Sequence, residues 1–138
     1  IHVAGLPRSL GGRLDIAVLQ QRDDLGSTCL AKLDEIFRAG PPRLADWDVE
    51  LRKTWVKKML TRARVGDAEG NYRRHWLLFD LLENYFQLRG LWYLGPKESL
   101  RWLSTNAPAT YKIFEQALRP EASLADIEQL ALCVVSGP

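Results

Sequence analysis

The chain has 138 residues, of which 46% are hydrophobic and 26% are charged, and its formal net charge is +2. This composition is close to the globular average, so it excludes wholesale disorder and fits a single domain with its own core. The small net charge gives no support for a nucleic-acid partner, which would need a clustered basic patch. No apolar run reaches the roughly 18 residues needed to cross a bilayer, so we expect no membrane partner.

The two cysteines, Cys29 and Cys133, lie far apart and belong to no Cys-x-x-Cys or Cys-His spacing. We therefore interpret both as small buried hydrophobic residues in a reducing compartment. The first residues lack the charged and apolar regions of a signal peptide, so we expect a cytoplasmic protein. Because the chain begins with Ile1 rather than methionine, we also expect a fragment or a processed product.

Residues 11–20 predict a β-strand, because apolar side chains at alternate positions would share one face. Leu14, Ile16 and Val18 form that face, and Asp15 lies on the other. A single strand is not stable without partners. We therefore assign residues 1–22 to a short N-terminal strand region and residues 23–138 to a helical domain.

From residue 24 onward the apolar residues recur with helical spacing, interrupted by proline and glycine. We expect helices over about 25–39, 46–65, 68–89, 96–105, 108–119 and 123–135. The last of these begins with Ser123 and Asp126, in the spacing of a capping box. The predicted fold is mainly α, a five- to six-helix bundle with a short N-terminal β-strand region.

The helix over 68–89 is the most apolar, and its wide hydrophobic stripe predicts a central, largely buried position. We expect His75, on that stripe, to be packed rather than catalytic. Asp80 and Glu83 lie one turn apart on its polar stripe, beside Gln87. Such a pair acts as a general base or binds a cation in a cleft, or else simply faces water.

Six basic residues and no acidic ones occur between Arg52 and Arg64. They flank an apolar stripe on both sides, which is typical of a solvated amphipathic helix with snorkelling side chains. A phosphate-binding face is the alternative.

The order of elements after residue 85 resembles the helical C-terminal domain of nucleotidyltransferase-fold proteins, particularly the aminoglycoside adenylyltransferase-like group. The resemblance rests on an aromatic helix, the break before Pro96-Lys97, the segment "ESLRWL" and the proline-started "PATYKIFEQAL". The matching residues are Lys97, Leu100, Trp102, Pro108 and Tyr111.

The resemblance implies a substrate cleft closed by these helices. Lys97, with Arg101, would lie near a nucleotide triphosphate, whereas without the resemblance Lys97 is an exposed residue of a first helical turn. Asp80, Glu83, Gln87 and Trp102 would contact the substrate, and the first three would share one concavity with Lys97 and Arg101. Asp15 would correspond to a third metal-binding carboxylate, and ATP with Mg2+ would be the cofactors.

The family's catalytic signature, a Gly-Ser turn followed about ten residues later by Asp-x-Asp, is not in this chain. The segment "LGSTCLAKLDE" has the Gly-Ser but lacks Asp-x-Asp. Two divalent metals need two or three clustered carboxylates, and Asp15 alone cannot hold them. We therefore expect a substrate- or nucleotide-binding helical part without catalysis of its own. The alternative is a stand-alone helical protein-interaction module that uses aromatic residues near 92–102.

Overall fold

The computed structural model describes residues 24–137 of the chain. They form six α-helices: α2 (Asp24–Ala39), α3 (Asp46–Ala63), α4 (Ala68–Leu88), α5 (Gly95–Asn106), α6 (Pro108–Leu118) and α7 (Leu124–Val135). Within this range there is no strand, and the expected mainly α class is confirmed. The strand expected over 11–20, the proposed N-terminal region 1–22 and Asp15 lie outside the described residues.

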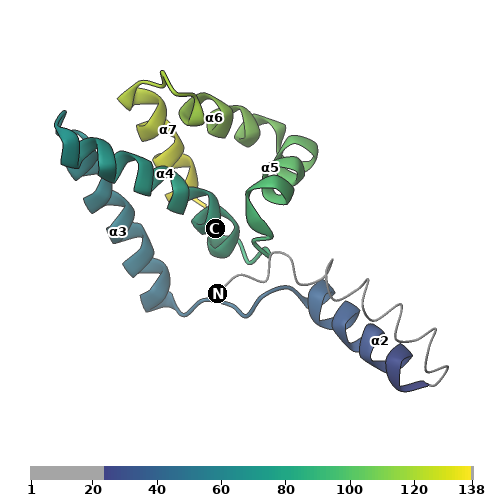
Figure 1. Ribbon diagram of the computed structural model, residues 1–138. Coiled ribbons are helices and arrows are strands. Elements are labelled where there is room, and N and C mark those ends of the chain that lie inside the picture. The colour runs from purple at the N-terminus through teal and green to yellow at the C-terminus, as the bar shows by residue number, and fades with distance from the viewer. Residues whose placement is uncertain (1–23, 138) are drawn as a thin grey trace.

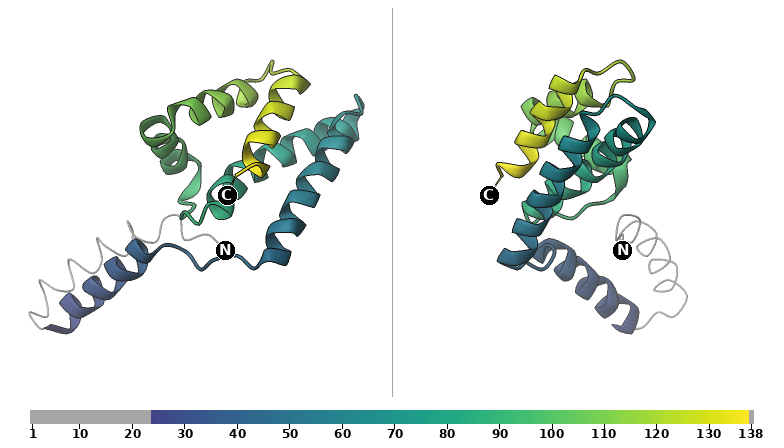
Figure 2. Two further views of the ribbon diagram at one scale, coloured as in Figure 1. Left: turned by 180° about the vertical axis from the view of Figure 1, so that it is seen from behind. Right: turned by 90° about the vertical axis from the view of Figure 1, so that its left-hand side faces the viewer.

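The body of the molecule is built around α4, which packs against α3, α7 and α5 (Figure 1). The loop between α3 and α4 is short, so these two helices form a hairpin, and α7 packs against both of them. α5 and α6 pack against each other, and α6 returns the chain to α7. α2 differs from the other helices because it extends away from this body, as the two views of Figure 2 also show.

Local signals in the sequence explain where α4 begins and ends. Its N-cap is Asp67, whose carboxylate accepts a hydrogen bond from the Gly70 amide at 2.8 Å. At the other end, Gly90 has a φ of 68°, and its amide donates to the Gln87 carbonyl at 3.2 Å. The next amide, of Leu91, donates to the Phe86 carbonyl at 2.9 Å, which completes a Schellman motif. α4 therefore ends at Leu88, and Gly90 forms the turn that follows it.

α7 is capped at both ends. The capping box expected at Ser123 and Asp126 is present, with both reciprocal hydrogen bonds formed. At the C-terminal end, the guanidinium of Arg89 donates to the carbonyls of Cys133, at 2.9 Å, and Val134, at 3.2 Å. A cation at a helix C-terminus also interacts favourably with the helix dipole, so Arg89 ties the end of α4 to the end of α7.

The core lies where α3, α4, α5, α6 and α7 meet. Its largest fully buried side chains, each with a relative exposure under 2% except Phe86 at 2%, come from five helices. They are Val56, Leu77, Leu81, Phe86, Leu103, Phe114, Ile127, Leu130 and Val134.

The expectation that the helix over 68–89 is largely buried is wrong for the N-terminal half of α4. Tyr72, Trp76 and Phe79 are 66%, 52% and 60% exposed, and His75 is exposed rather than packed. These positions share one stripe of the helix, on the side away from the buried Leu77 and Leu81, and no described helix covers that stripe. Separately, Cys29 lies exposed on α2, which corrects its interpretation as a buried residue.

Candidate functional site

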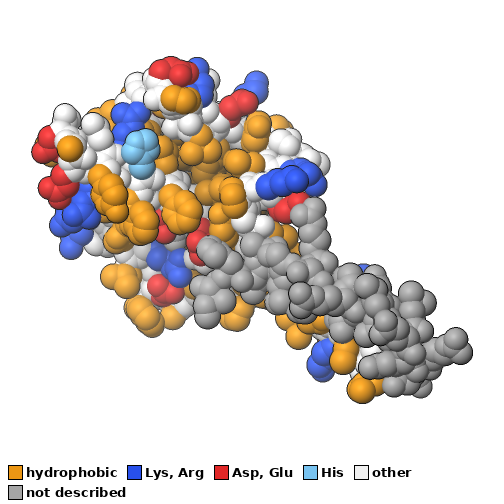
Figure 3. Space-filling model, viewed as in Figure 1, with side chains coloured by type: hydrophobic (Ala, Val, Ile, Leu, Met, Phe, Trp, Pro, Cys, Tyr) orange, Lys and Arg blue, Asp and Glu red, His pale blue; other side chains and the backbone are white. Residues whose placement is uncertain are grey.

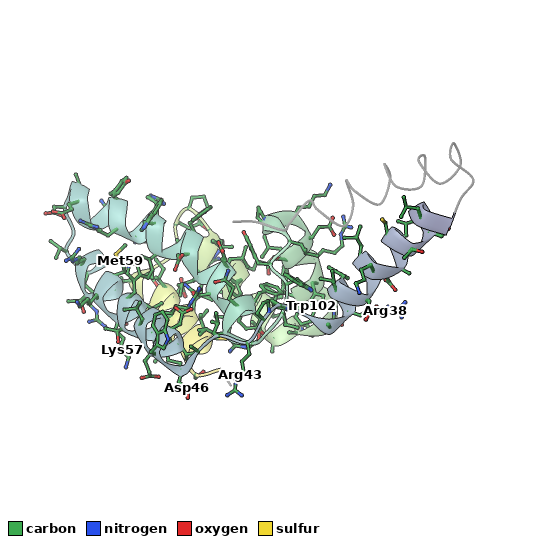
Figure 4. All side chains as sticks on the ribbon, turned by 90° about the horizontal axis from the view of Figure 1, so that it is seen from below. Arg38, Arg43, Asp46, Lys57, Met59 and Trp102 are labelled. Atoms are coloured by element: carbon green, nitrogen blue, oxygen red, sulfur yellow. The ribbon has the colours of Figure 1, made fainter. Side chains whose placement is uncertain are left out.

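A cavity of about 400 Å³ lies where α5 meets the end of α4 and the end of α2. Ligand pockets in proteins commonly measure about 300–1,000 Å³, so this cavity is large enough for a small molecule. Figure 4 shows Trp102 on the side of α5 toward the C-terminal end of α2. The lining residues are Phe37, Phe86, Leu91, Trp92, Leu94, Glu98, Ser99, Arg101, Trp102, Thr105 and Asn106. We call this cavity the α5 pocket.

Aromatic rings form much of the wall of the α5 pocket. Phe37 of α2 stacks on Trp92, with ring centroids 6.4 Å apart and an interplanar angle of 4°. The indole N–H of Trp92 also donates to the Phe37 carbonyl at 2.8 Å. Trp102 meets Phe86 edge to face, at 5.5 Å and 69°. Such rings offer flat apolar faces to a planar ligand.

Three polar side chains stand out beside these rings. Arg101 is well exposed, with 61% of its side chain accessible, and its Nη1 lies 3.5 Å from Oε2 of Glu98. Lys97, one helical turn before Arg101 and so on the same side of α5, is also exposed. Ser99 is 2% exposed, and its buried Oγ has no hydrogen-bond partner among the described residues. Exposed cations and a buried hydroxyl are thus both present at α5.

The polar stripe of α4 is engaged elsewhere, in a network centred on Arg52 of α3. Arg52 Nη1 donates to Oδ1 of Asn84 at 2.9 Å and to Oε1 of Gln87. Each amide then passes a hydrogen bond to a carboxylate one turn back: Asn84 Nδ2 donates to Asp80, and Gln87 Nε2 donates to Glu83 at 2.8 Å. One guanidinium is therefore linked to two carboxylates through two amides. We call this group the Arg52 network.

Asp48 completes the Arg52 network from the same helix as Arg52, with its Oδ1 3.2 Å from Arg52 Nε. Asn84 is 3% exposed, so the middle of the network is buried between α3 and α4. A buried amide that is fully hydrogen-bonded fixes the register of the helices that supply its partners.

Burial has a measurable electrostatic consequence in the Arg52 network. It raises the pKa of the Asp80 carboxyl above its ordinary value, and the nearby Glu83 carboxylate adds to the rise. The guanidinium of Arg52 and the hydrogen bond from Asn84 act in the opposite direction, but less strongly. Burial, followed by the charge of Glu83, also raises the pKa of the Tyr93 phenol.

The structure does not gather all of the predicted site residues. Arg101 and Trp102 line the α5 pocket, whereas Gln87 lines a second cavity of about 290 Å³ between α3 and the end of α4. Asp80 and Glu83 belong to the Arg52 network, two turns and one turn before Gln87 on α4, respectively. Lys97 lines neither of these two cavities. The structure therefore does not form the single concavity expected for Asp80, Glu83, Gln87, Lys97 and Arg101.

The fit of ATP and Mg2+ differs between these places. At the α5 pocket, aromatic faces suit a nucleobase and Arg101 suits a phosphate. Glu98 is the carboxylate among the lining residues, and Mg2+ commonly takes one or two carboxylates together with substrate phosphates. Within residues 24–137, no three His, Cys, Asp or Glu side chains are grouped so that they could hold a metal ion.

No helix in that range could span a membrane.

A second aromatic surface is open rather than enclosed. It consists of Tyr72, His75, Trp76 and Phe79 on the N-terminal half of α4, and we call it the α4 face. The rings of Trp76 and Phe79 stack, with centroids 6.0 Å apart. Figure 3 shows hydrophobic side chains gathered over α4 on this side of the molecule.

Sequence reasoning missed three residues at these sites. Phe37 reaches the α5 pocket from α2, and nothing in its local sequence indicates that contact. Ser99 is exceptional for its burial, which periodicity did not reveal. Arg52 had a usable signal, because Asp48 precedes it by one helical turn and predicts an intrahelical ion pair.

Comparison with known proteins gives no further guide to the site. The chain matches no protein-family model. It also matches no curated protein and no solved structure.

Proposed function

We propose that this chain is the substrate- or nucleotide-binding helical part of a nucleotidyltransferase-like protein of the cytoplasm, and that it does not catalyse transfer by itself. Catalysis would depend on a Gly-Ser turn followed about ten residues later by Asp-x-Asp, and these 138 residues contain no such pair at that spacing. ATP with Mg2+ is the nucleotide that the resemblance implies.

The observation that carries this proposal is the α5 pocket. It combines aromatic walls with a cation, Arg101, at one helix. Nucleobases stack on aromatic side chains, and guanidinium groups bind phosphate through charge-assisted hydrogen bonds. Lys97 adds a second positive charge one turn before Arg101, near the start of α5, where backbone amides also favour anions.

The geometry also predicts weak binding. Glu98 approaches Arg101 at 3.5 Å, so an incoming phosphate must compete with a carboxylate for this guanidinium. Lys97 is exposed, and its interaction with phosphate is therefore screened by water and salt. We expect affinity for ATP in the high micromolar to millimolar range, where about 4–6 kcal/mol of binding free energy is available.

An NMR titration with ATP and magnesium tests the proposal. Lys97→Ala should weaken binding by about 1.5–3 kcal/mol, or about tenfold or more, because a charge-assisted contact with phosphate is lost. Lys112→Ala, which removes an exposed lysine of α6, is the matched control and should leave the affinity unchanged. Unchanged spectra around Lys97 at millimolar ATP would contradict the proposal.

The gene gives an independent test. Reading the frame upstream of Ile1 should reveal a Gly-Ser turn followed about ten residues later by Asp-x-Asp. A start codon immediately before Ile1, with no such motif, would favour a stand-alone protein.

The α4 face favours a second candidate, a helical protein-interaction module. Among the aromatic residues near 92–102, Tyr93 is 8% exposed, and Trp92 and Trp102 line the α5 pocket. Tyr72, Trp76 and Phe79 form a stripe of exposed aromatic residues on one helix, and surfaces of this kind mark protein contacts. A photo-crosslinker at position 76, compared with one at the exposed position 115 of α6, would detect a partner selectively at position 76.

A further inference from the structure

We propose that the α5 pocket encloses the base of the nucleotide, with Ser99 as its hydrogen-bonding partner, and that an enclosed base fastens α2 to the body. This inference rests on the proposed function and deepens it. The base would lie at Ser99 and the phosphates at Arg101, and binding would hold α2 against the rest of the molecule.

The walls suit a planar heteroaromatic ring more than a flexible or bulky ligand. The stacked pair of Phe37 and Trp92 bounds the pocket from the side of α2, and Trp102 with Phe86 bounds it from the body. A ring between these groups would contact aromatic faces while displacing water from an apolar space. Both effects favour binding, and neither depends on the sugar or the phosphates.

Ser99 favours a ring that carries a hydrogen-bonding group at its edge. Its Oγ is buried, it lines the pocket and it has no hydrogen-bond partner among the described residues. A buried hydroxyl without a partner carries a desolvation cost that a ligand can remove. Because a hydroxyl both donates and accepts, it can bond to a ring nitrogen or to an exocyclic amino group.

The charged end of the ligand would then lie outside. Arg101 lines the same pocket, but most of its side chain is exposed, so its guanidinium lies toward solvent. Ser99 is buried, and Arg101 follows it by two residues on the same helix. A base at Ser99 with phosphates at Arg101 places the apolar part of a nucleotide inside and the ionised part in water, as solvation requires.

The link to α2 follows from how this helix is attached. α2 extends from the body, and most of its apolar side chains are accessible, including Leu25 at 66% and Ile36 at 52%. Its last turn supplies Phe37, which stacks on Trp92 and accepts the indole hydrogen bond. A base that packs between Phe37 and Trp102 would add contacts at this joint, and α2 would open from the body less often.

The experiment compares adenosine, ATP and inorganic triphosphate by NMR titration of the whole chain. Adenosine should bind and compete with ATP, whereas inorganic triphosphate should bind much more weakly than ATP. Ser99→Ala should weaken adenosine and ATP alike, by about fivefold for one hydrogen bond. Ser104→Ala, which removes an exposed hydroxyl of the same helix, should change neither.

Ser99→Ala replaces an unpaired buried hydroxyl with a methyl group, so the variant should unfold no more readily than the wild-type protein. Loss of binding can therefore be separated from loss of fold. Hydrogen exchange of the α2 amides, measured with and without saturating adenosine, reports on the joint. Exchange should slow in the occupied protein, and Phe37→Ala should remove this protection.

The outcomes separate the inference from the proposed function. Binding of ATP without competition by adenosine, or equal affinities for wild type and Ser99→Ala, would overturn the placement of the base and leave nucleotide binding intact. Unchanged exchange of α2 in the saturated protein would overturn the fastening of this helix. Failure of both adenosine and ATP to bind at millimolar concentration would overturn the inference together with the proposed function.

Discussion

The α5 pocket and the α4 face are both rich in aromatic side chains, yet they differ in enclosure. The rings of the α5 pocket come from α2, α5 and the segment around the end of α4, and they line a partly open hollow of about 400 Å³. The rings of the α4 face come from one helix, follow its helical spacing and remain more than half exposed. A pocket bounded by several elements suits a small ligand, whereas a stripe on a single helix suits another macromolecular surface.

Both regions include residues of α4, but they lie at different ends of this helix. Phe79 belongs to the α4 face and Phe86 to the wall of the α5 pocket, and the Arg52 network takes its α4 residues from the turns around and between them. Two phenylalanines of the same 21-residue helix therefore differ in burial, although they are equally hydrophobic. The difference arises because other parts of the chain cover Phe86, whereas no described helix covers Phe79.

The largest effect on stability should come from truncating Phe86, the buried residue of the pair Phe79 and Phe86. Phe86 is 2% exposed and contacts the rings of Tyr85, Tyr93 and Trp102. Phe86→Ala should lower the free energy of unfolding by about 3–5 kcal/mol, because it leaves a cavity in the core. Urea denaturation measures the change.

Phe79→Ala is the matched control, since it truncates the same residue type on the exposed half of α4. It should change the free energy of unfolding by no more than about 0.5 kcal/mol. Comparable losses in the two variants would show that the α4 face is covered in solution, and the contrast between the two regions would fail.

The next largest effect concerns the Arg52 network. Arg52→Ala should lower the free energy of unfolding by about 1–3 kcal/mol, because buried Asn84 loses its partner and two carboxylates lose their compensating charge. Arg62→Ala removes an exposed arginine from the last turn of the same helix and should cost less than about 0.5 kcal/mol. If urea denaturation gives equal values for the two variants, the network contributes nothing to the joining of α3 and α4.

A smaller effect should appear in the pH dependence of stability. The folded protein raises the pKa of Asp80, so it holds this proton more tightly than the unfolded chain does. Stability therefore falls as the pH rises from the unfolded value of about 3.9 through the raised folded value. Asp80→Asn lacks this loss and can still accept the hydrogen bond from Asn84.

The advantage of Asp80→Asn over the wild-type protein should grow with pH across that window and stay constant above it. Urea denaturation at a series of pH values measures this difference. Glu115→Gln, at an exposed position of α6, controls for a general change in net charge. A difference between Asp80→Asn and wild type that does not vary with pH would show that burial does not perturb this carboxyl.

Local features of the fold could be predicted from the sequence, because they depend on residues close together in the chain. The start of α4 after Asp67, and the capping box of α7, follow from side chains that bond to amides within three residues. The apolar face of α3 was also predicted, and Val56, Met59 and Ala63 are buried. The left-handed φ of Gly90 is a property of the folded backbone, so hydrophobic periodicity alone did not reveal the Schellman motif that ends α4.

The candidate site was much less predictable. Arg101 and Trp102 were expected at a binding site and line the α5 pocket, but Phe37, which also lines it, lies 64 residues before Arg101 in the chain. Asp80, Glu83 and Gln87 were placed on one stripe, yet a guanidinium from α3 binds that stripe and so engages it away from α5. Such contacts depend on how helices cross, which helical periodicity does not specify.

The most direct measurement is the affinity for ATP, with magnesium present, of Trp102→Ala and Trp76→Ala by NMR titration. Each variant removes one partly exposed tryptophan, 37% exposed at position 102 and 52% exposed at position 76. If the α5 pocket binds the nucleotide, Trp102→Ala should weaken binding by about fivefold or more, since stacking of a base on an aromatic ring contributes about 1–3 kcal/mol. Trp76→Ala should bind ATP as the wild-type protein does. Equal affinities in the two variants, or a loss confined to Trp76→Ala, would contradict the assignment of nucleotide binding to the α5 pocket.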